Sequence, residues 1–320
     1  MAKQAVLLLA HGTPETVEQI PEYLRNVVSG RPLPQAVVEE IQHRYSLIGH
    51  SPLTEITFEQ ARLVEKELAA SGQQVPVYVG MRNWRPYIPE VVRQMRADGV
   101  EEAAVICMAP QNSRTSVGLY RRAVEAEAGS LRIDFTESWA QHPLLAEAFA
   151  ERLSPLLSRL MAETGAPVPV LFTAHSVPTR TVQPPAPGDT SPKLWPGTGA
   201  DPYAEDAKQT ASMVAALVPA IPHWWFAFQS QGASGGPWIG PTAEETLEFI
   251  SATGVKTLIL DPIGFLCDHV EILFDVDRLF RDHAAKLGIR LERPESLNAS
   301  PTLSRAVAEL ARQGLTRLRS

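Results

Sequence analysis

A histidine and a row of carboxylates in the second half of the chain have the residue types and spacing for proton transfer and metal handling. His175 follows an apolar run and stands where a buried strand would end. Asp268, Glu271 and Asp275 recur at intervals of three and four residues, which places them on one face of a helix. A histidine titrates near neutral pH and can take a proton, while carboxylates suit a hard cation. A row of acids that points toward a cleft containing a histidine would suit the path of a hard cation.

Each of these residues also has a purely structural interpretation. Asp268 stands where the N-cap of a helix belongs, and capping is its expected role. Glu271 would lie in the first turn, where the helix dipole favours an anion. A row of acids also suits a solvated helix face. A lone histidine is more often structural than catalytic, so the functional interpretation of His175 requires that the acids lie beside it.

Short apolar runs alternate with longer segments of helical periodicity along the chain. The runs predict buried strands at residues 6–10, 77–80, 103–108, 131–136, 168–173, 224–228, 257–260 and 289–291. The periodic segments predict helices at residues 57–70, 143–163, 204–217, 243–250 and 270–286. Strands that alternate with helices indicate an α/β fold with a mostly parallel sheet that helices cover on both faces.

The two halves of the chain echo each other in sequence. An apolar strand pattern, then Ala-His, a small residue, and a proline two positions later occur around His11 and again around His175. We therefore predict two similar domains, residues 1–160 and 161–320, although chance remains the alternative for so short a match. In an open α/β sheet the ligand lies outside the carboxyl ends of the strands, so both histidines would face one shared cleft.

Composition excludes several classes of protein. The chain is 44% hydrophobic and 20% charged, as in soluble globular proteins, and a net charge of −7 disfavours a nucleic-acid partner. Cys107 and Cys267 lack the spacing of a disulfide framework, a zinc site or an iron–sulfur cluster. No apolar run approaches the ~20 residues of a transmembrane segment. We expect a cytoplasmic protein, and a peripheral attachment to a membrane stays open.

Two segments lack any periodicity. Residues 179–199 are rich in Pro, Gly, Ser and Thr and are predicted to form a loop, either a lid over a ligand or a disordered surface insertion. The glycine-rich residues 231–236 imitate a phosphate-binding loop, but they lack its lysine and the pattern that opens a helix. A nucleotide site is therefore rejected.

Five motifs, in this order, resemble those of the ferrochelatase family. They are Leu9-Ala-His-Gly-Thr-Pro14, Ser51-Pro-Leu-x-x-Ile-Thr57, Thr173-Ala-His-Ser-Val-Pro178, Phe228-Gln-Ser230 with Gly236-Pro-Trp-Ile-Gly-Pro241, and Gly264-Phe-x-x-Asp-His-x-Glu271. The resemblance runs over nearly the whole chain, and five ordered motifs are far more specific than any one of them.

The resemblance implies a fold and a chemistry. It implies two similar flavodoxin-like domains with a porphyrin bound in the cleft between them. His175 would remove pyrrole protons or contact the metal, Glu271 would belong to the same centre, and Asp275 would continue an acid ladder along one helix. These three residues are the predicted metal contacts. Metal insertion strips protons from the porphyrin and water from the cation, which requires a base and carboxylates on the approach path.

Within the family, the segment around Arg31 and the pair Arg44-Tyr45 resemble the compact bacterial enzymes that metallate coproporphyrin III. The resemblance implies substrate binding by His11, Arg31, Arg44, Tyr45, Ser51, Tyr120 and Trp238, with the arginines pairing propionates. Some compact relatives have tyrosine in place of His11, so His11 either ligates iron or lines the pocket. The outer acid of the ladder is replaced near Leu279, which weakens the case for a second metal site.

We therefore predict a lyase of haem biosynthesis that inserts ferrous iron into coproporphyrin III to give coprohaem. Insertion into protoporphyrin IX, or of cobalt or nickel into another tetrapyrrole, are the enzymatic alternatives. A two-lobed haem-binding protein is the alternative without catalysis. A porphyrin and ferrous iron are the expected partners, with other haem-pathway enzymes as further candidates. Iron is a substrate here, so neither a tightly bound cofactor nor an iron–sulfur cluster is expected.

Overall fold

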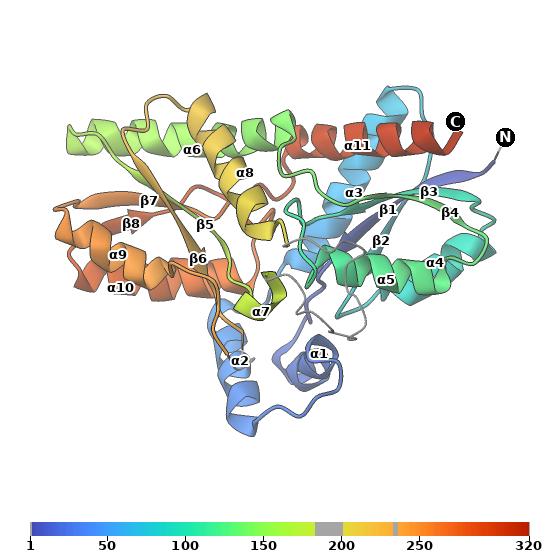
Figure 1. Cartoon of the computed structure of the whole chain (residues 1–320), viewed down its shortest axis with the longest axis horizontal. Coiled ribbons are helices and arrows are strands. Elements are labelled where there is room, and N and C mark those ends of the chain that lie inside the picture. The colour runs from blue at the N-terminus through green and yellow to red at the C-terminus, as the bar shows by residue number, and fades with distance from the viewer. Residues whose placement is uncertain (1, 183–200, 233–235, 320) are drawn as a thin grey trace. The chain divides into compact units, whose positions relative to one another are not determined.

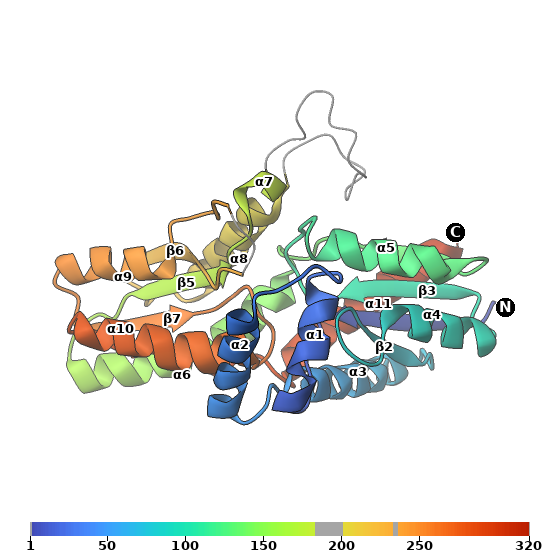
Figure 2. The same ribbon diagram turned by 90° about the horizontal axis from the view of Figure 1, so that it is seen from below.

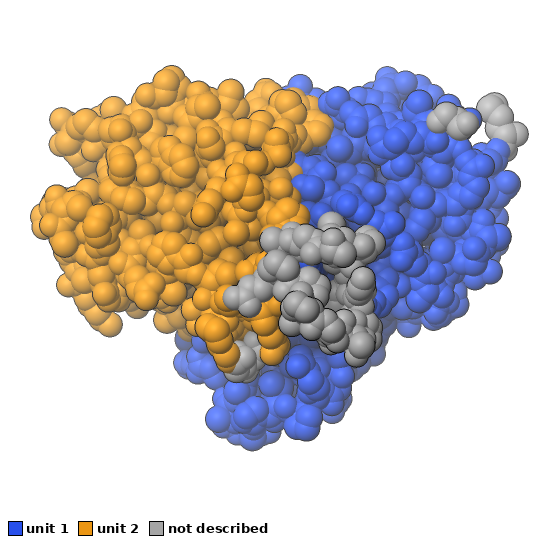
Figure 3. All heavy atoms as spheres, in the orientation of Figure 1, with its two compact units in different colours: residues 1–139, 190–197, 298–320 blue, residues 140–189, 198–297 orange. Residues whose placement is uncertain are grey.

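Apolar strands and amphipathic helices produce two parallel sheets in the computed structural model, each inside its own unit of the chain. The structure describes residues 2–182, 201–232 and 236–319. Of these, unit 1 contains residues 2–139 and 298–319, and unit 2 contains residues 140–182, 201–232 and 236–297 (Figure 3). The predicted halves, 1–160 and 161–320, differ from these units in two helices. Helix α6 (Pro143–Thr164), most of which falls in the first predicted half, lies in unit 2. Helix α11 (Pro301–Arg319), which falls in the second predicted half, lies in unit 1.

Unit 1 is built on sheet A, whose strands are parallel and follow the order β2-β1-β3-β4. The strands are β1 (Gln4–Ala10), β2 (Val77–Met81), β3 (Glu102–Cys107) and β4 (Arg132–Thr136). Helices α4 (Ile88–Ala97) and α5 (Val117–Ala128) cover one face, and α3 (Leu53–Ala70) and α11 cover the other (Figures 1 and 2). Every residue of β1 is buried, so the strand is a continuous apolar run rather than an alternating one. The unit also contains η1 (Val17–Gln19), α1 (Ile20–Val27) and α2 (Gln35–Ile48).

Unit 2 repeats this plan on sheet B, a parallel sheet with the order β6-β5-β7-β8. The strands are β5 (Val170–His175), β6 (Trp224–Gln229), β7 (Thr257–Asp261) and β8 (Arg290–Glu292). Helix α9 (Ala243–Ala252), η2 (Glu271–Phe280) and α10 (Arg281–Lys286) pack on one face, and α6 and α8 (Tyr203–Leu217) lie on the other (Figure 1). The shared plan confirms the predicted α/β fold with two similar domains.

The predicted strands are all confirmed, and so are four of the predicted helices, which lie within α3, α6, α8 and α9. The predictions do not include α1, α2, α4, α5 or α11. Helix α4 has a complete amphipathic pattern, because Ile88, Val91, Val92 and Met95 are its buried residues. The signal for that helix was therefore present in the sequence.

Two segments differ from the predictions. The predicted helix at residues 270–286 is helical, but its first part, η2, is a π-helix rather than an α-helix. The loop predicted at residues 179–199 is wrong for its first residues, which form α7 (Thr179–Val182). The remaining residues of that loop lie outside the described part. In the described ranges, no helix is both long enough and apolar enough to cross a membrane.

Candidate active site

The carboxyl ends of β5 and β7 mark the topological switch point of sheet B. These strands lie side by side, and the chain leaves them toward opposite edges of the sheet, to β6 from one and to β8 from the other. Ligands of open α/β sheets bind outside such a switch point. His175 is the last residue of β5, and the connection after β7 leads to Glu271, the first residue of η2.

Gly264 allows the connection after β7 to pass against the end of β5. A Cβ atom at this position would lie 2.8 Å from the Cα and Cβ atoms of Ala174, a distance that no side chain tolerates. The Gly264 N–H also donates to the Thr173 carbonyl, at 3.2 Å. The glycine of the Gly-Phe-x-x-Asp-His-x-Glu motif therefore serves a close backbone approach that brings Glu271 toward His175.

His175 and Glu271 meet directly. The His175 Nε2 atom lies 3.2 Å from Glu271 Oε1, and His175 Nδ1 contacts the backbone carbonyl of Ser176. A carbonyl and an ionised carboxylate can only accept hydrogen bonds. An imidazole that makes both contacts as hydrogen bonds must therefore carry a proton on each nitrogen, which makes it an imidazolium.

His269 repeats this arrangement on the other oxygen of Glu271. Its Nε2 atom lies 3.2 Å from Glu271 Oε2, and its Nδ1 atom lies 3.0 Å from the Cys267 carbonyl. The residue is buried, with 7% of its surface exposed. His269 was not among the predicted site residues. The signal that could have found it is its place two residues before Glu271 in the same motif.

The two histidines determine the protonation state of Glu271. Burial alone would raise the pKa of Glu271, but the charges and hydrogen bonds of His175 and His269 outweigh burial and hold that pKa well below its usual range. Burial likewise opposes the charged form of His175, whereas Glu271, the Ser176 carbonyl and Asp275 favour it, so the pKa of His175 is raised. Both directions favour an imidazolium paired with a carboxylate near neutral pH.

Aromatic rings line this cluster. The rings of Trp238 and Phe265 each lie with their centroids 6.3 Å from that of His175, and Phe265 lies 4.7 Å from His269. The His175 and Glu271 side chains remain 30% and 32% exposed. An apolar wall strengthens the electrostatic interactions inside it, while the remaining exposure lets a ligand reach the pair. The structure therefore places the predicted residues His175, Glu271 and Trp238 together.

Asp275 lies about one turn beyond Glu271 on η2. A π-helix closes its hydrogen bonds between residues i and i+5, so residues four apart stay on one face. Asp275 is buried and accepts a hydrogen bond from Ser230 Oγ at 2.5 Å. Ser230 has a φ of 60°, which is uncommon for a residue other than glycine and is typical of functional sites. The backbone at the end of β6 is thus strained in the place where it holds the second acid.

Asp268 does not belong to the row of acids. The N-cap residue of η2 is Val270, which makes no side-chain cap, so Asp268 lies two residues before the N-cap position where it was expected. The Asp268 Oδ1 atom instead accepts hydrogen bonds from Ser296 Oγ at 2.7 Å and Arg293 Nη2 at 3.1 Å. These partners come from a later segment of the chain, and helix periodicity carries no information about them.

Metal binding by His175, Glu271 and Asp275 stays a prediction. In the residues that the structure describes, no group of three or more His, Cys, Asp or Glu side chains is arranged to hold a metal ion. The carboxylate of Glu271 is engaged by two imidazoles, and that of Asp275 by Ser230.

The predicted substrate-binding residues of unit 1 fall into two kinds. Arg31 and Arg44 lie toward the surface, where Arg31 Nε donates to the Val28 carbonyl at 3.0 Å and Arg44 Nε pairs with Glu40 Oε1 at 3.0 Å. The hydroxyl-bearing residues are buried instead. They are Tyr45, Ser51 and Tyr120.

His11 follows β1 at the switch point of sheet A, the counterpart of the place that His175 has in sheet B. Its Nε2 atom lies 2.8 Å from the Tyr23 hydroxyl, and the Asn83 Nδ2 atom lies 3.1 Å from the same nitrogen. Both of these groups are uncharged. The surroundings of His11 therefore differ from those of His175.

Comparisons with known proteins agree with the motifs. The family model described as ferrochelatase matches residues 3–315. The ferrochelatase of Acidobacterium capsulatum is 58% identical over 319 residues, which cover 99% of this chain and 96% of that relative. The coproporphyrin III ferrochelatase of Mycolicibacterium vanbaalenii is 32% identical, over 97% of this chain and 89% of its own length.

A solved structure shares the fold. The sirohydrochlorin chelatase SirB from Bacillus subtilis, in complex with cobalt, has a TM-score of 0.56 and 13% identity, covering 97% of this chain and 94% of that one. At that identity the likeness concerns the fold alone. The match of the family model over nearly the whole chain and the identity to curated relatives show that this chain belongs to the ferrochelatase family.

Proposed function

We propose that this ferrochelatase inserts ferrous iron into coproporphyrin III and that His175 and Glu271 form its proton-transfer centre. One observation carries the proposal for the centre: the Glu271 carboxylate lies between the Nε2 atoms of His175 and His269, at 3.2 Å from each. Such a cluster offers several groups that can accept a proton within hydrogen-bond distance of one another. Metal insertion needs this property, because each pyrrole N–H must give up its proton as the cation enters.

The proposed reaction uses the cluster as a base and a relay. An approaching cation disfavours the imidazolium form of His175, so its Nε2 proton moves toward Glu271. The freed Nε2 atom then accepts a proton from the porphyrin. His269, on the second oxygen of Glu271, supplies an alternative position for the proton that has been displaced. General-base catalysis of this kind contributes roughly 10²- to 10⁴-fold to a rate.

Asp275 is the proposed second carboxylate on the path of the cation. It lies on η2 with Glu271, and the Ser230 hydroxyl fixes one of its oxygens. The next position at this spacing is Leu279, which is 44% exposed and cannot bind a cation. We therefore assign the acid row of this chain to Glu271 and Asp275. Hydrated divalent cations such as ferrous iron are attracted electrostatically by closely spaced carboxylates before they lose their water.

Two groups in unit 1 support a substrate with many carboxylates. The buried Ser51 Oγ atom has no hydrogen-bond partner within the described residues. Arg82 directly follows β2 and donates to the Thr115 carbonyl at 3.1 Å, while no carboxylate of the described part lies within ion-pair distance of it. Burial lowers the pKa of Arg82, as expected for a cation without an acidic partner. A propionate would satisfy either group.

Some of the curated relatives support the same porphyrin, whereas the relative from Acidobacterium capsulatum is named only a ferrochelatase. Those from Mycolicibacterium vanbaalenii and Nocardia farcinica, at 32% and 33% identity, are named coproporphyrin III ferrochelatases. Coproporphyrin III has propionates where protoporphyrin IX has two vinyl groups. Each charge-assisted hydrogen bond to an added propionate contributes about 1.5–3 kcal/mol. A site built to bind these groups discriminates strongly against an analogue without them.

Parallel anaerobic assays test the substrate. Ferrous iron is incubated with coproporphyrin III or protoporphyrin IX, and the absorbance change gives kcat/KM for each. We expect a higher value for coproporphyrin III, and we expect Arg44→Ala and Ser51→Ala to reduce the preference more than the turnover number. Equal or better use of protoporphyrin IX by the unmodified enzyme would overturn the coproporphyrin assignment and leave the ferrochelatase activity unaffected.

A further inference from the structure

Arg293 joins the two acids that flank the proposed catalytic segment. It lies just after β8, and its side chain is only 12% exposed. Its Nε and Nη2 atoms each donate to Asp277 at 2.8 Å, as a two-pronged contact, and Nη2 also lies 3.1 Å from Asp268 Oδ1. Asp268 precedes Glu271 and Asp277 follows Asp275. One guanidinium therefore bridges the residues before and after both functional acids.

The remaining donors of Arg293 are also used. Its Nη1 atom donates to the Pro294 carbonyl at 3.0 Å, and Ser296 Oγ, 3.5 Å from Nη1, donates to Asp268 at 2.7 Å. Burial opposes the charged form of Arg293, but Asp277 and Asp268 outweigh burial and raise its pKa. The group is therefore a fixed cation in a single geometry, because a planar guanidinium bound on several sides cannot rotate.

The segment that Arg293 flanks is a π-helix, a rare conformation that occurs frequently at functional sites. The first turn of η2 carries Glu271, and its N-cap residue, Val270, makes no side-chain cap. A contact from outside the helix must therefore set the angle at which the chain enters η2. Arg293 supplies one contact before this turn, at Asp268, and one after it, at Asp277.

We propose that Arg293 is a positioning residue for metal insertion, which holds Glu271 between its two histidines by clamping Asp268 to Asp277. This inference rests on the proposed role of Glu271. It predicts that loss of the clamp lowers turnover without weakening porphyrin binding, because Arg293 itself contacts neither the histidines nor the aromatic walls.

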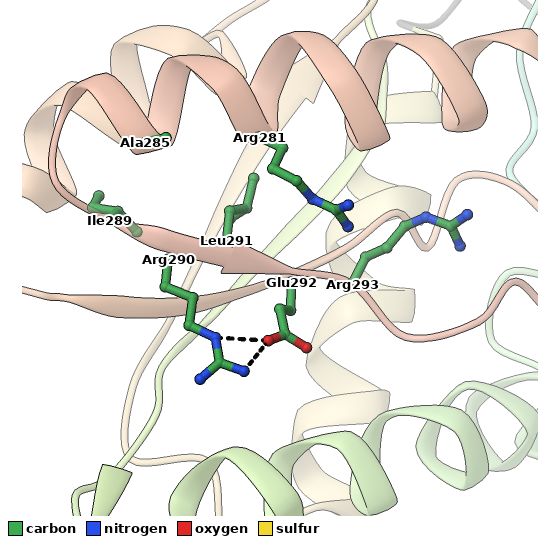
Figure 4. A pocket seen from close by; sticks show the side chains of 7 residues that line it. All are labelled: Arg281, Ala285, Ile289, Arg290, Leu291, Glu292 and Arg293. Carbon is green, nitrogen blue, oxygen red and sulfur yellow. Dashed lines mark hydrogen bonds and ion pairs between the residues drawn. The ribbon is translucent and has the colours of Figure 1, made fainter. Parts of the chain in front are cut away.

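Arg290, the first residue of β8, provides a matched control three residues before Arg293. Both arginines line a cavity of about 420 Å³, and Figure 4 shows Arg290 bonded to Glu292 while the Arg293 guanidinium points away from both. Arg290 also pairs with Glu163 of α6 at 2.8 Å and is 47% exposed. The ion-pair partners of Arg290 belong to β8 and α6. Arg290→Gln therefore removes ion pairs of an arginine without removing a contact to η2.

The first experiment compares Arg293→Gln with Arg290→Gln. It measures kcat and the KM for ferrous iron, the Kd for metal-free porphyrin by fluorescence quenching, and the thermal midpoint of unfolding. We expect Arg293→Gln to lower kcat roughly 10- to 100-fold, the effect of a small misplacement of catalytic groups, with a Kd within about twofold of the unmodified enzyme. Arg290→Gln is expected to change kcat by less than about twofold. Equal kcat values in the two variants would overturn the proposal.

A second variant separates position from stability. Arg293→Gln leaves Asp268 without its cation and Asp277 with only the longer pair to Arg281, at 3.6 Å, and adding Asp277→Asn removes one of the two charges, so the thermal midpoint should recover in part. Turnover should not recover, because no clamp is restored. Recovery of kcat together with the midpoint would overturn the positioning role and leave Arg293 as a structural cation.

Arg293→Lys keeps the charge and tests the geometry if the glutamine variant does not fold. An ammonium group cannot hold two carboxylates in a fixed plane. The lysine variant should therefore keep most of the stability and lose several-fold in kcat, and full activity would overturn the clamp. The proposed role of Glu271 is tested separately with Glu271→Gln. Wild-type turnover in that variant would overturn the role of Glu271, whatever the result for Arg293.

Discussion

His11 and His175 occupy the same place in two similar sheets, and they differ in the charge of their partners. His175 lies 3.2 Å from the carboxylate of Glu271, whereas His11 contacts the hydroxyl of Tyr23 and the amide of Asn83. A carboxylate stabilises an imidazolium, whereas a hydroxyl and an amide carry no charge that would do so. A repeated Ala-His motif at a strand end therefore gives the position of a histidine, and the neighbouring connection decides its chemistry.

That neighbouring connection is the one that follows the adjacent strand of each sheet. After β7 it brings Glu271 and His269, which are titratable groups. After β3 it brings three buried neutral side chains, Gln111, Asn112 and Ser113, and then the buried Arg114. We infer from the contrast that unit 2 holds the proton chemistry and that the corresponding site of unit 1 recognises polar groups.

The largest expected effect comes from His175→Ala, which removes the proposed base. We expect kcat to fall roughly 10²- to 10⁴-fold while the Kd for metal-free porphyrin stays nearly unchanged, since the aromatic walls remain. Anaerobic kinetics and fluorescence quenching measure the two quantities. His11→Ala is the matched control, with an expected loss of less than about tenfold. A larger loss in the His11 variant than in the His175 variant would reverse the comparison.

Glu271→Gln should follow, with a loss of roughly 10²- to 10³-fold in kcat. Glutamine preserves the shape but removes the anion that raises the pKa of His175. The pKa of His175 should therefore fall toward its ordinary value of 6.5, which NMR titration of the imidazole can measure. An unchanged His175 titration would mean that the carboxylate does not control the histidine.

Asp275→Asn should have a smaller and more selective effect, about tenfold on the KM for ferrous iron with less change in kcat. The acid is proposed to guide the cation rather than to take a proton. Ser230→Ala, which removes the hydrogen bond to Asp275, should shift the same parameter by less. If either variant lost only stability and kept its iron dependence, Asp275 would be a structural acid.

A substitution in unit 1 can give His11 a carboxylate partner like that of His175. Asn83→Asp places a carboxylate beside His11, where the amide nitrogen now lies 3.1 Å from the ring. The pKa of His11 should rise by about one unit, and turnover should change only a few-fold. NMR titration gives the shift, with Asn83→Ala as the uncharged control. An unchanged pKa of His11 in Asn83→Asp would show that solvent screens the new carboxylate. The difference between His11 and His175 would then not depend on charge alone.

The smallest expected effect concerns stability and pH. The raised pKa of His175 stabilises the fold below the ordinary value of 6.5, and this contribution disappears as the pH rises through the raised value. The lowered pKa of Glu271 stabilises the fold above 4.5, and this contribution disappears as the pH falls through the lowered value. Thermal melts of the unmodified enzyme and Glu271→Gln should therefore differ most between these pH values, by roughly a few degrees. A difference independent of pH would contradict the ion pair.

The sheets were predictable from sequence because their strands are buried on both faces. A strand such as β1 is then apolar at nearly every position, here from Ala5 to Ala10, and no other element is required to recognise it. The π-helix was not predictable, since side chains four apart share a face in both kinds of helix. The backbone of η2 depends on contacts such as those of Arg293 with Asp268 and Asp277, which come from a distant segment.

The site was predictable where one motif contains both partners of a contact or fixes a close backbone approach. Gly264 and Glu271 belong to one motif, and the glycine brings that motif to His175. Asp268 illustrates the opposite case, because its local sequence indicates an N-cap and its actual partners are Arg293 and Ser296. Sequence reasoning failed where a local role competed with a tertiary one, and the tertiary contacts were stronger.

The position of α11 has a consequence for the order in which the protein folds during synthesis. This helix packs against β3 and β4 of unit 1, and Gly314 approaches so closely that a Cβ atom there would lie 3.0 Å from Ala104 Cβ. All of unit 2 leaves the ribosome before α11 does. We expect unit 2 to be protease-resistant in a released chain truncated at residue 297, while sheet A stays open on its β3–β4 side. The usual order, in which the N-terminal unit folds first, would then be reversed.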